Sequence, residues 1–358
     1  PSVEENTFKS ARAGGVVLVS DDFLTSFGEI GANWNGLIID VNRLEQLTWT
    51  TTGGEVTITD CDTSASGTLV IPDTIEGNPV TGIGRAAFED CKSLTSITIP
   101  DSVTSIGDFV FSRCYNLTSV AIPDSVTSIG VLAFQKCSEL TNVNIPDSVT
   151  SIANGTFSDC SSLTSIAIPD SVTTIGQNAF LGCSSLMSVT IPDSVTTIVR
   201  SAFFNCSSLT SVTIGNGVTS IPVNAFRGCS SLTSVTIPNG VTSIESRAFY
   251  DCTSLASITF TGPVPTTLGA NIFDNIAAGA VVIVSDGFLA GFGEIGSTWN
   301  GLIIDVNRLE QLTWTTTGGE VAITDCDTSA SGDLAIPDTI DGNPVTSIGD
   351  YAFRNCSS

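Results

Sequence analysis

Residues with metal-binding or redox-active side chains recur along this chain at a fixed spacing. Cysteines follow one another at a constant interval in an unbroken series: Cys91, Cys114, Cys137, Cys160, Cys183, Cys206, Cys229 and Cys252. Aspartates repeat with the same period, and two asparagines continue their series: Asp101, Asp124, Asp147, Asp170, Asp193, Asn216 and Asn239. Thiolates bind zinc and form disulfides, whereas carboxylates bind calcium. Any such chemistry would be repeated along the molecule instead of being gathered in one centre.

Catalysis is restricted by the absence of histidine from all 358 residues. Neither a Ser-His-Asp nor a Cys-His centre can be assembled without it. The cysteines also lack C-x-x-C spacing, which argues against a structural zinc site. Paired carboxylates remain, but the repeat distributes them along the chain. We therefore expect no enzyme activity, no cofactor and no metal centre, with calcium at the aspartate series as the one metal alternative.

A phenylalanine accompanies each cysteine of the series, three residues before it: Phe88, Phe111, Phe134, Phe157, Phe180, Phe203, Phe226 and Phe249. A constant period of this length means that one short supersecondary unit is stacked on copies of itself, because a single unit cannot bury its apolar face alone. The chain is therefore predicted to be a solenoid. Its function should be sought on a repeated surface.

Within one coil, apolar residues predict a short strand followed by a return run. Leu94, Ile97 and Ile99 follow an L-x-x-L-x-L spacing, in which the aliphatic side chains point inward and the intervening residues outward. Pro100 should end the strand, because it has no N–H to donate to a ladder. Further along, Val103 and Ile106 lead the chain back along the core.

The rest of the coil completes the pattern of a known repeat. Gly107 is expected to permit a tight turn, and Phe111 to fill the coil from the convex side. The pattern is similar to the 23-residue Treponema-type leucine-rich repeat of BspA-like bacterial surface proteins. It covers about Pro72 to Phe260, with Gly215 in place of the strand-ending proline and Val199 in place of the turn glycine.

The predicted fold class is a mainly β leucine-rich-repeat solenoid, right-handed, with a parallel sheet on one face and capped by non-repeat β segments. A second, longer period indicates tandem modules, because the segment 8–93 recurs as 273–358, with Phe8 matching Phe273 and Trp34 matching Trp299. We divide the chain into the cap remnant of a preceding module at 1–45, a complete module at 46–305 and the start of the next at 306–358. The complete module comprises a first coil at 46–80, eight repeats at about 81–260 and a closing cap at 261–305.

The joint between modules should be rigid. It is short, contains no glycine or proline, and carries the apolar residues Val306, Leu309 and Leu312. We expect this segment to pack and to hold neighbouring modules at a constant angle.

The eleven cysteines are predicted to be structural. Nine occupy one position in the repeat, with Cys356 as the ninth, and Cys61 and Cys326 are a matched pair one long period apart. Coils about 4.7–4.9 Å apart would bring neighbouring cysteines within disulfide range, but side chains on successive coils run parallel. Buried reduced thiols that pack as small hydrophobic groups are one interpretation, and occasional bridges between coils the other.

The aspartate series has two explanations. Asp and Asn can both accept a hydrogen bond from the backbone two residues on and form an Asx-type turn, which accounts for both residue types. A calcium ladder at Asp101, Asp124, Asp147, Asp170 and Asp193 would use the same oxygens, but it would lose a charge at each asparagine.

The outward positions of the strands form the one large repeated surface, predicted to be concave. Its candidate binding residues are Ser96, Thr98, Ser119, Asn142, Asn144, Ser165, Ser188, Thr190, Ser211, Thr213, Ser234, Thr236, Ser257 and Thr259, with Ala121 and Ala167 interrupting the second column. The face lacks the Trp, Tyr and Arg residues of typical recognition hot spots. It could be a soluble strand surface, a site for weak, avid binding of a repetitive glycan or matrix protein, or an ice-binding array.

Charge restricts the partners. The chain has 36 acidic and 12 basic residues, a formal net charge of −24, which repels nucleic acid and anionic membranes. It contains no run of 18 apolar residues, so we expect no membrane insertion in this segment.

Three functions compete. The resemblance implies a segment of a long extracellular or cell-surface protein whose tandem modules form an adhesive stalk or fibre, with neighbouring modules or chains as partners. The alternatives are a dedicated binding module for glycan or matrix protein, and a spacer attached to an enzyme elsewhere in a longer chain.

Overall fold

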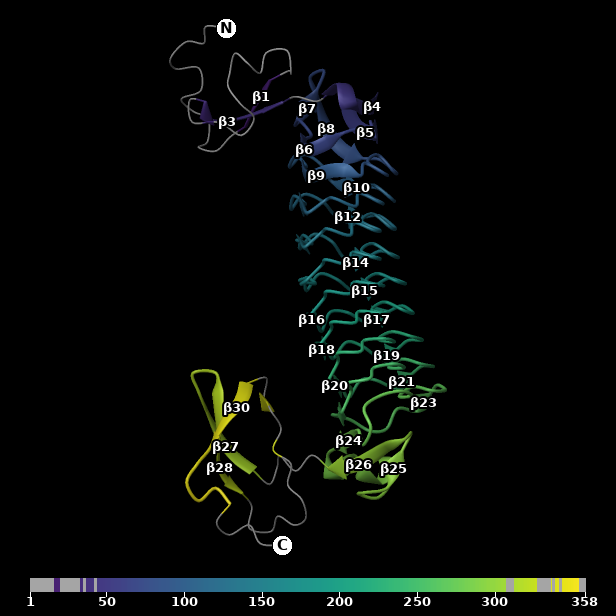
Figure 1. Ribbon diagram of the computed structural model, residues 1–358, viewed down its shortest axis with the longest axis vertical. Coiled ribbons are helices and arrows are strands. Elements are labelled where there is room, and N and C mark those ends of the chain that lie inside the picture. Colours follow the sequence, from purple (N-terminus) through teal and green to yellow (C-terminus); the bar gives the residue numbers. More distant parts are fainter. Residues whose placement is uncertain are drawn as a thin grey trace.

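The computed structural model describes residues 16–19, 33–34, 37–41, 44–306, 312–326, 336, 339–340 and 343–353. Residues 44–306 form a stack of flat coils, each of which lies on the one before it (Figure 1). The predicted class of mainly β parallel solenoid is confirmed. In this part of the chain, helix is limited to short segments: η2 (Leu44–Gln46), η3 (Asp286–Phe288) and α2 (Leu289–Phe292). No helix in the described ranges is long and apolar enough to cross a bilayer.

The first sheet is parallel and has the predicted period. Ser96 pairs with Ser119, and Ser188 with Ser211, each at the equivalent position of the next coil. The side chains alternate as expected, with Val189 buried between the exposed Ser188 and Thr190. The strands of this column are β6 (Ser66–Val70), β9 (Ser93–Thr98), β11 (Ser119–Ala121), β13 (Asn142–Val143), β16 (Ser188–Ile191), β18 (Ser211–Ile214), β20 (Ser234–Ile237), β22 (Ser257–Phe260) and β24 (Val281–Val284).

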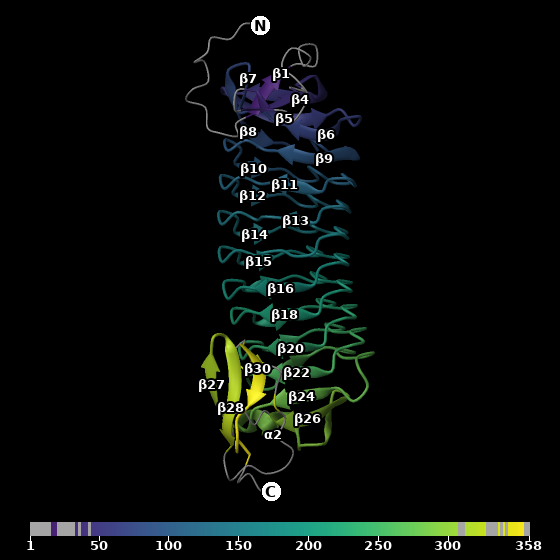
Figure 2. The ribbon, with the colours of Figure 1, turned by 60° about the vertical axis from the view of Figure 1, so that its left-hand side comes forward.

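The return run forms a second parallel column, which the sequence did not predict (Figure 2). Each strand is a two-residue segment. In all but the last strand the second residue, such as Ile106, is buried and the first, such as Ser105, is exposed or half-buried, whereas both residues of the last strand, Thr267 and Leu268, are exposed. Ser105 pairs with Ser128 one coil later. These strands are β10 (Ser105–Ile106), β12 (Ser128–Ile129), β14 (Ser151–Ile152), β15 (Thr174–Ile175), β17 (Thr197–Ile198), β19 (Ser220–Ile221), β21 (Ser243–Ile244) and β23 (Thr267–Leu268).

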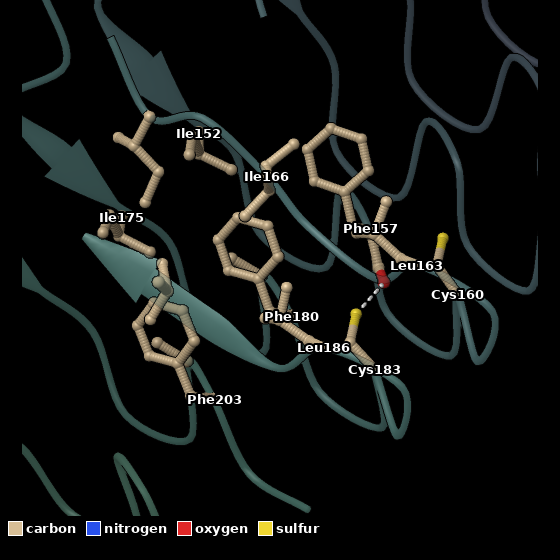
Figure 3. Packing of buried hydrophobic residues seen from close by; sticks show 14 of the residues in the cluster. Ile152, Phe157, Cys160, Leu163, Ile166, Ile175, Phe180, Cys183, Leu186 and Phe203 are labelled. Atoms are coloured by element: carbon tan, nitrogen blue, oxygen red, sulfur yellow. Dashed lines mark hydrogen bonds between the residues drawn. The ribbon is translucent and has the colours of Figure 1, made fainter. Parts of the chain in front are cut away.

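The core is a continuous stack of phenylalanine rings. Phe157 and Phe180 have parallel rings with centroids 5.5 Å apart, and Phe180 and Phe203 follow at 5.2 Å (Figure 3). The eight ladder rings from Phe88 to Phe249 are fully buried. The stack continues into Phe273, whose ring lies 5.6 Å from that of Phe249. The solenoid therefore extends beyond the last 23-residue repeat, and residues 261–284 form one further coil with β23 and β24.

The turn around the ladder phenylalanine, which was predicted to be convex and is called the convex turn here, contains two residues of positive φ, four positions apart, in each coil from Ala86 to Asn275. Phe109 and Arg113 have φ values of 58° and 62°, and the equivalent Asn178 and Gly182 have 57° and 71°. Glycine and asparagine adopt this left-handed conformation most easily, but bulky residues occupy it in several coils. The conformation is held by hydrogen bonds to the next coil, such as that from the Phe109 N–H to the Val131 carbonyl at 2.9 Å.

Gly107 has a different role from the one predicted. Its φ is not in the left-handed region, and an added Cβ would lie 2.8 Å from the backbone nitrogen of Arg85 in the preceding coil. Val199 occupies the equivalent position and donates the same inter-coil hydrogen bond, to Ile175 at 2.9 Å. The coils lie close together at Gly107, but the turn does not need the conformational freedom of glycine, and Val199 shows that the same inter-coil hydrogen bond forms with a side chain at this position.

Gly155 has a left-handed backbone conformation and also lies close to a side chain of the preceding coil, so we expect its replacement by alanine to be destabilising. Its φ is +62°, and an added Cβ would lie 2.5 Å from Cδ2 of Leu132. Gly155→Ala should lower the free energy of unfolding by about 1–2 kcal/mol, measured by chemical denaturation. Gly279→Ala is the matched control, because Gly279 has φ +77° with no atom within 4 Å of the added Cβ. An equal loss in both variants would show that the contact with Leu132 is unimportant.

The first coil is built on a hairpin that occurs a second time near the end of the described chain. Leu47 pairs with Cys61 and Leu312 with Cys326, and both hairpins have a register shift at the following Thr-Trp step. The first copy comprises β4 (Leu47–Thr52), β5 (Glu55–Cys61), β7 (Thr74–Ile75) and β8 (Asn78–Ile83). The second comprises β27 (Leu312–Thr317), β28 (Glu320–Cys326), β29 (Thr339–Ile340) and β30 (Asn343–Ile348).

The closing segment also recurs. Trp34 pairs with Leu37, and Trp299 pairs with Leu302 in the same antiparallel register. The two copies are β1 (Val16–Val19), β2 (Asn33–Trp34) and β3 (Leu37–Val41), and β24 with β25 (Thr298–Trp299) and β26 (Leu302–Val306). In the second copy the Trp299 ring packs 5.5 Å from that of Phe260 and 5.0 Å from that of Phe292, which covers the end of the core. Most of the predicted joint, including Leu309, lies outside the described residues.

Candidate functional site

The predicted binding residues lie together on the outer side of the first sheet. We call them the hydroxyl face: Ser96, Thr98, Ser119, Asn142, Asn144, Ser165, Ser188, Thr190, Ser211, Thr213, Ser234, Thr236, Ser257 and Thr259. Ser96, Ser257 and Thr259 are half-buried, and the others are exposed. Strand pairing aligns them in two columns, since Ser211 pairs with Ser188 and Thr213 with Thr190. The structure thus provides a flat array of small polar side chains.

A third exposed column borders this face and was not predicted. It lies one residue before the first column of the hydroxyl face and consists of Thr95, Thr118, Thr141, Thr164, Met187, Thr210, Thr233 and Ala256. The hydroxyls of four of its threonines are bonded within the molecule, as that of Thr118 donates to the Thr95 carbonyl at 2.9 Å and that of Thr210 to the Met187 carbonyl at 3.0 Å. The recurrent Leu-Thr-Ser sequence was the signal for this column.

Hydroxyls elsewhere on the solenoid are also bonded to backbone. Ser125 on the Pro-Asp-Ser turn donates to the Val103 carbonyl at 2.6 Å, and Thr127 beside the second sheet donates to the Thr104 carbonyl at 3.2 Å. In the described part of the chain, the hydroxyl face differs, because its one side-chain hydrogen bond joins Ser96 to Thr68 at 2.8 Å. Most of its hydroxyls are therefore available to an external partner.

The aspartate series does not form the predicted Asx turns. In an Asx turn the side chain of Asp101 would accept a hydrogen bond from the N–H of Val103. That N–H donates instead to the Pro100 carbonyl at 3.0 Å, and this bond closes an ordinary backbone turn. Asp101 itself is exposed, as are its equivalents Asp124, Asp147, Asp170 and Asp193. No group of three or more His, Cys, Asp or Glu side chains in the described ranges is arranged to hold a metal ion.

The cysteine ladder is buried next to the phenylalanine stack. Each thiol from Cys114 to Cys252 donates to the carbonyl of the ladder phenylalanine in the preceding coil, as Cys183 does to Phe157 at 3.1 Å (Figure 3). Burial raises the pKa of Cys252 to about 12 and raises the pKa of Cys160 well above its usual value. These thiols are free and remain protonated at neutral pH.

A group of arginine and aromatic residues lies away from the strands, near the convex turns. The Arg227 guanidinium lies 5.3 Å from the ring centre of Phe204 and 5.1 Å from that of Tyr250, and Arg247 lies 5.8 Å from the same tyrosine. Cation–π contacts hold these side chains against one another. Sequence reasoning missed this cluster, because its members come from the variable residues of successive coils.

Comparison with known proteins agrees with the repeat pattern. Residues 68–184 and 150–278 match the BspA type leucine-rich repeat region in six copies. Similar crystal structures include the T. pallidum leucine-rich repeat protein TpLRR (26% identity, 64% of this chain and 86% of that one, TM-score 0.41). A leucine-rich cell surface protein from Faecalibacterium prausnitzii A2-165 has 27% identity over 65% of this chain and 93% of that one, with a TM-score of 0.32.

The pneumococcal vaccine antigen PcpA has 17% identity over 73% of this chain and 92% of that one, with a TM-score of 0.36. The curated protein sequences include no match. The matched repeat region, at 68–278, spans more than half of the chain and coincides with the coils of the solenoid. The chain therefore belongs to the family of proteins with BspA-type leucine-rich repeats.

Proposed function

We propose that the chain is a non-catalytic segment of a bacterial extracellular or cell-surface protein, in which tandem solenoid modules form an adhesive stalk. The observation that carries this proposal is the recurrence of the first-coil hairpin of 47–61 at 312–326, with the same register and the same irregularity. Repeating one module at a fixed interval produces length and not a reaction centre. BspA-type repeats belong to surface proteins of this kind, which supports the proposed location.

The interior of the module suits a stalk. The phenylalanine stack is unbroken from Phe88 to Phe273, and the aromatic cluster around Trp299 follows it. Because every coil is fastened to its two neighbours, bending the module requires many coils to separate at once. The module should act as a stiff rod.

Small-angle scattering on a chain of two successive modules tests the stalk. We expect one narrow distribution of inter-module angles, because the apolar Leu309 and Leu312 should hold the joint in place. A second chain with four Gly-Ser residues inserted after Val306 provides the comparison and should show a broad distribution. If both chains were equally broad, the segment would be a flexible string and the rigid stalk would be wrong.

Ligand binding by the hydroxyl face is a second candidate, supported by its free hydroxyls. A flat array of hydroxyl and amide groups with a repeat of one coil suits a repetitive glycan or matrix protein, bound weakly at each coil and strongly in sum. Surface plasmon resonance against immobilised glycans and matrix proteins would identify such a partner.

Matched substitutions locate the binding surface. We expect Ser188→Glu, Ser211→Glu and Ser234→Glu together to lower the affinity by about tenfold or more, since multivalent contacts are lost on three neighbouring coils. The control carries the same three charges beside the second sheet, as Thr150→Glu, Thr173→Glu and Thr196→Glu. Equal losses in the two variants would mean that the added charge, and not the hydroxyl face, controls binding.

A further inference from the structure

The first two cysteines of the module depart from the rest of the ladder. From Cys114 to Cys252, each sulfur lies 3.0–3.3 Å from a phenylalanine carbonyl of an earlier coil. Cys91 has no such partner, because the first coil lacks a ladder phenylalanine. Its sulfur lies 3.9 Å from the carbonyl oxygens of both Cys61 and Asp62. This thiol is therefore held against the backbone of the hairpin strand β5.

Cys61 is directed to the same place. Its sulfur lies 3.6 Å from the Asp62 carbonyl, so the two thiols share one acceptor. The two side chains are also hydrogen-bonded to each other, which raises the pKa of Cys61 and lowers that of Cys91. Both thiols are buried and free in the structure. Two sulfurs at hydrogen-bonding distance, one at the end of β5 and the other two residues before β9, are placed to form a bond.

The second copy of the first coil supplies an independent observation. Cys326 is the equivalent of Cys61, at the end of β28, which pairs with β27 in the register that β5 has with β4. Cys326 is disulfide-bonded. The equivalent of Cys91 is Cys356, which follows Cys326 at the same spacing and lies outside the described residues. The same local fold therefore supports a disulfide at this cysteine.

We propose that Cys61 and Cys91 form a disulfide that fastens the first-coil hairpin to the repeat array, whereas the thiols from Cys114 to Cys252 stay reduced. The hairpin is the N-terminal cover of the core, and an end coil has a neighbour on one side only, so a covalent link there opposes fraying. Such a disulfide forms and persists in an oxidising environment, such as the cell exterior.

The oxidant is a low-molecular-weight disulfide. The Cys91 thiolate attacks one of its sulfurs and releases one small thiol, and the Cys61 thiolate then attacks the Cys91 sulfur and releases the second. Two cysteine thiols are oxidised and one small disulfide is reduced to two thiols. Because both side chains are buried in the folded coil, the exchange takes place during folding, before the hairpin packs.

The test is to refold the full chain with oxidised glutathione and to map its peptides without reduction. We expect one peptide pair joined through Cys61 and Cys91 that separates on reduction, and alkylation of the seven ladder cysteines as free thiols after denaturation. Free Cys61 and Cys91 in the oxidised chain, or a link from Cys91 to Cys114, would overturn the proposal. The map uses the unmodified sequence, so its result does not depend on whether a variant folds.

Thermal unfolding of variants adds a second readout. Oxidation should raise the unfolding midpoint of residues 44–306 by roughly 5–10 °C in the unmodified chain. Cys61→Ala should abolish this rise, whereas Cys326→Ala, which removes the equivalent cysteine of the second copy, should leave it in place. A rise that survives Cys61→Ala would assign the stabilisation to another pair of cysteines.

Discussion

Raising the pH from 8 to 10.5 under reducing conditions is expected to unfold the solenoid in one steep transition. The cause is a set of seven fully buried thiols: Cys114, Cys137, Cys160, Cys183, Cys206, Cys229 and Cys252. Burial raises the pKa of each thiol in the folded state, to about 12 for Cys252 and in the same direction for the others. In the unfolded chain a cysteine has a pKa of about 8.5.

The sign of the effect follows from proton binding. Below about pH 8.5 the thiols are protonated in both the folded and the unfolded chain, so their ionisation does not lower the free energy of unfolding. Between this value and the folded-state pKa the unfolded chain loses protons that the folded chain keeps, and the free energy of unfolding falls with rising pH. Each thiol contributes about 1.4 kcal/mol per pH unit, and seven together contribute on the order of 10 kcal/mol per pH unit. This exceeds the total stability of most domains.

Circular dichroism during a pH titration, combined with urea unfolding at each pH, measures the slope. A variant with Cys160→Ala, Cys183→Ala and Cys206→Ala is the control, because it keeps four of the seven thiols in their coils. Its slope should be lower by roughly three sevenths. An unchanged slope would assign alkaline unfolding to other groups and would contradict the burial of the thiol ladder.

Phe203→Ala is expected to lower the free energy of unfolding by about 3–5 kcal/mol, since it leaves a cavity that the flat coils cannot close. The Phe203 ring is fully buried, with its centre 5.2 Å from that of Phe180 and 5.3 Å from that of Phe226. Because coils contact only their neighbours, the cavity should also weaken cooperativity between the two halves of the array.

The adjacent Phe204 provides the control. Its ring is half-buried and packs beneath the Arg227 guanidinium, outside the stack. Phe204→Ala should cost about 1 kcal/mol or less, as for a surface cation–π contact. Hydrogen exchange should show faster opening of the coils on both sides of residue 203 in the first variant alone. Equal losses in the two variants would mean that the ring stack contributes no more than surface packing.

Periodicity allowed the inward residues to be predicted, but not all of the backbone. Leu94, Ile97 and Phe111 were placed correctly, because burial repeats with the coil. The strand at Ser105–Ile106 is too short to show alternation, so the second sheet was missed. The left-handed residues could have been found from Asn178 and Gly182, whose types favour positive φ.

The sequence also predicted some features of the candidate site and missed others. The outward positions of Ser188 and Thr190 follow from strand geometry alone. Their hydroxyls are free, whereas the hydroxyl of Thr210 is bonded to the Met187 carbonyl. This difference depends on the distances between coils, which cannot be predicted from residue types. The turn at Asp101 was predicted wrongly for the same reason: backbone and side chain compete for one donor, and the Pro100 carbonyl takes it.

The hydrogen bonds between coils have a direction. Thiol and hydroxyl donors reach back to the preceding coil, as from Cys183 to Phe157, whereas N–H groups of the convex turn reach forward, as from Phe109 to Val131. A coil can therefore attach with its own side chains to the coil synthesised before it, and it then presents a row of amide donors to the coil that follows. The array can assemble in the order in which the chain leaves the ribosome or crosses a membrane, without waiting for its far end.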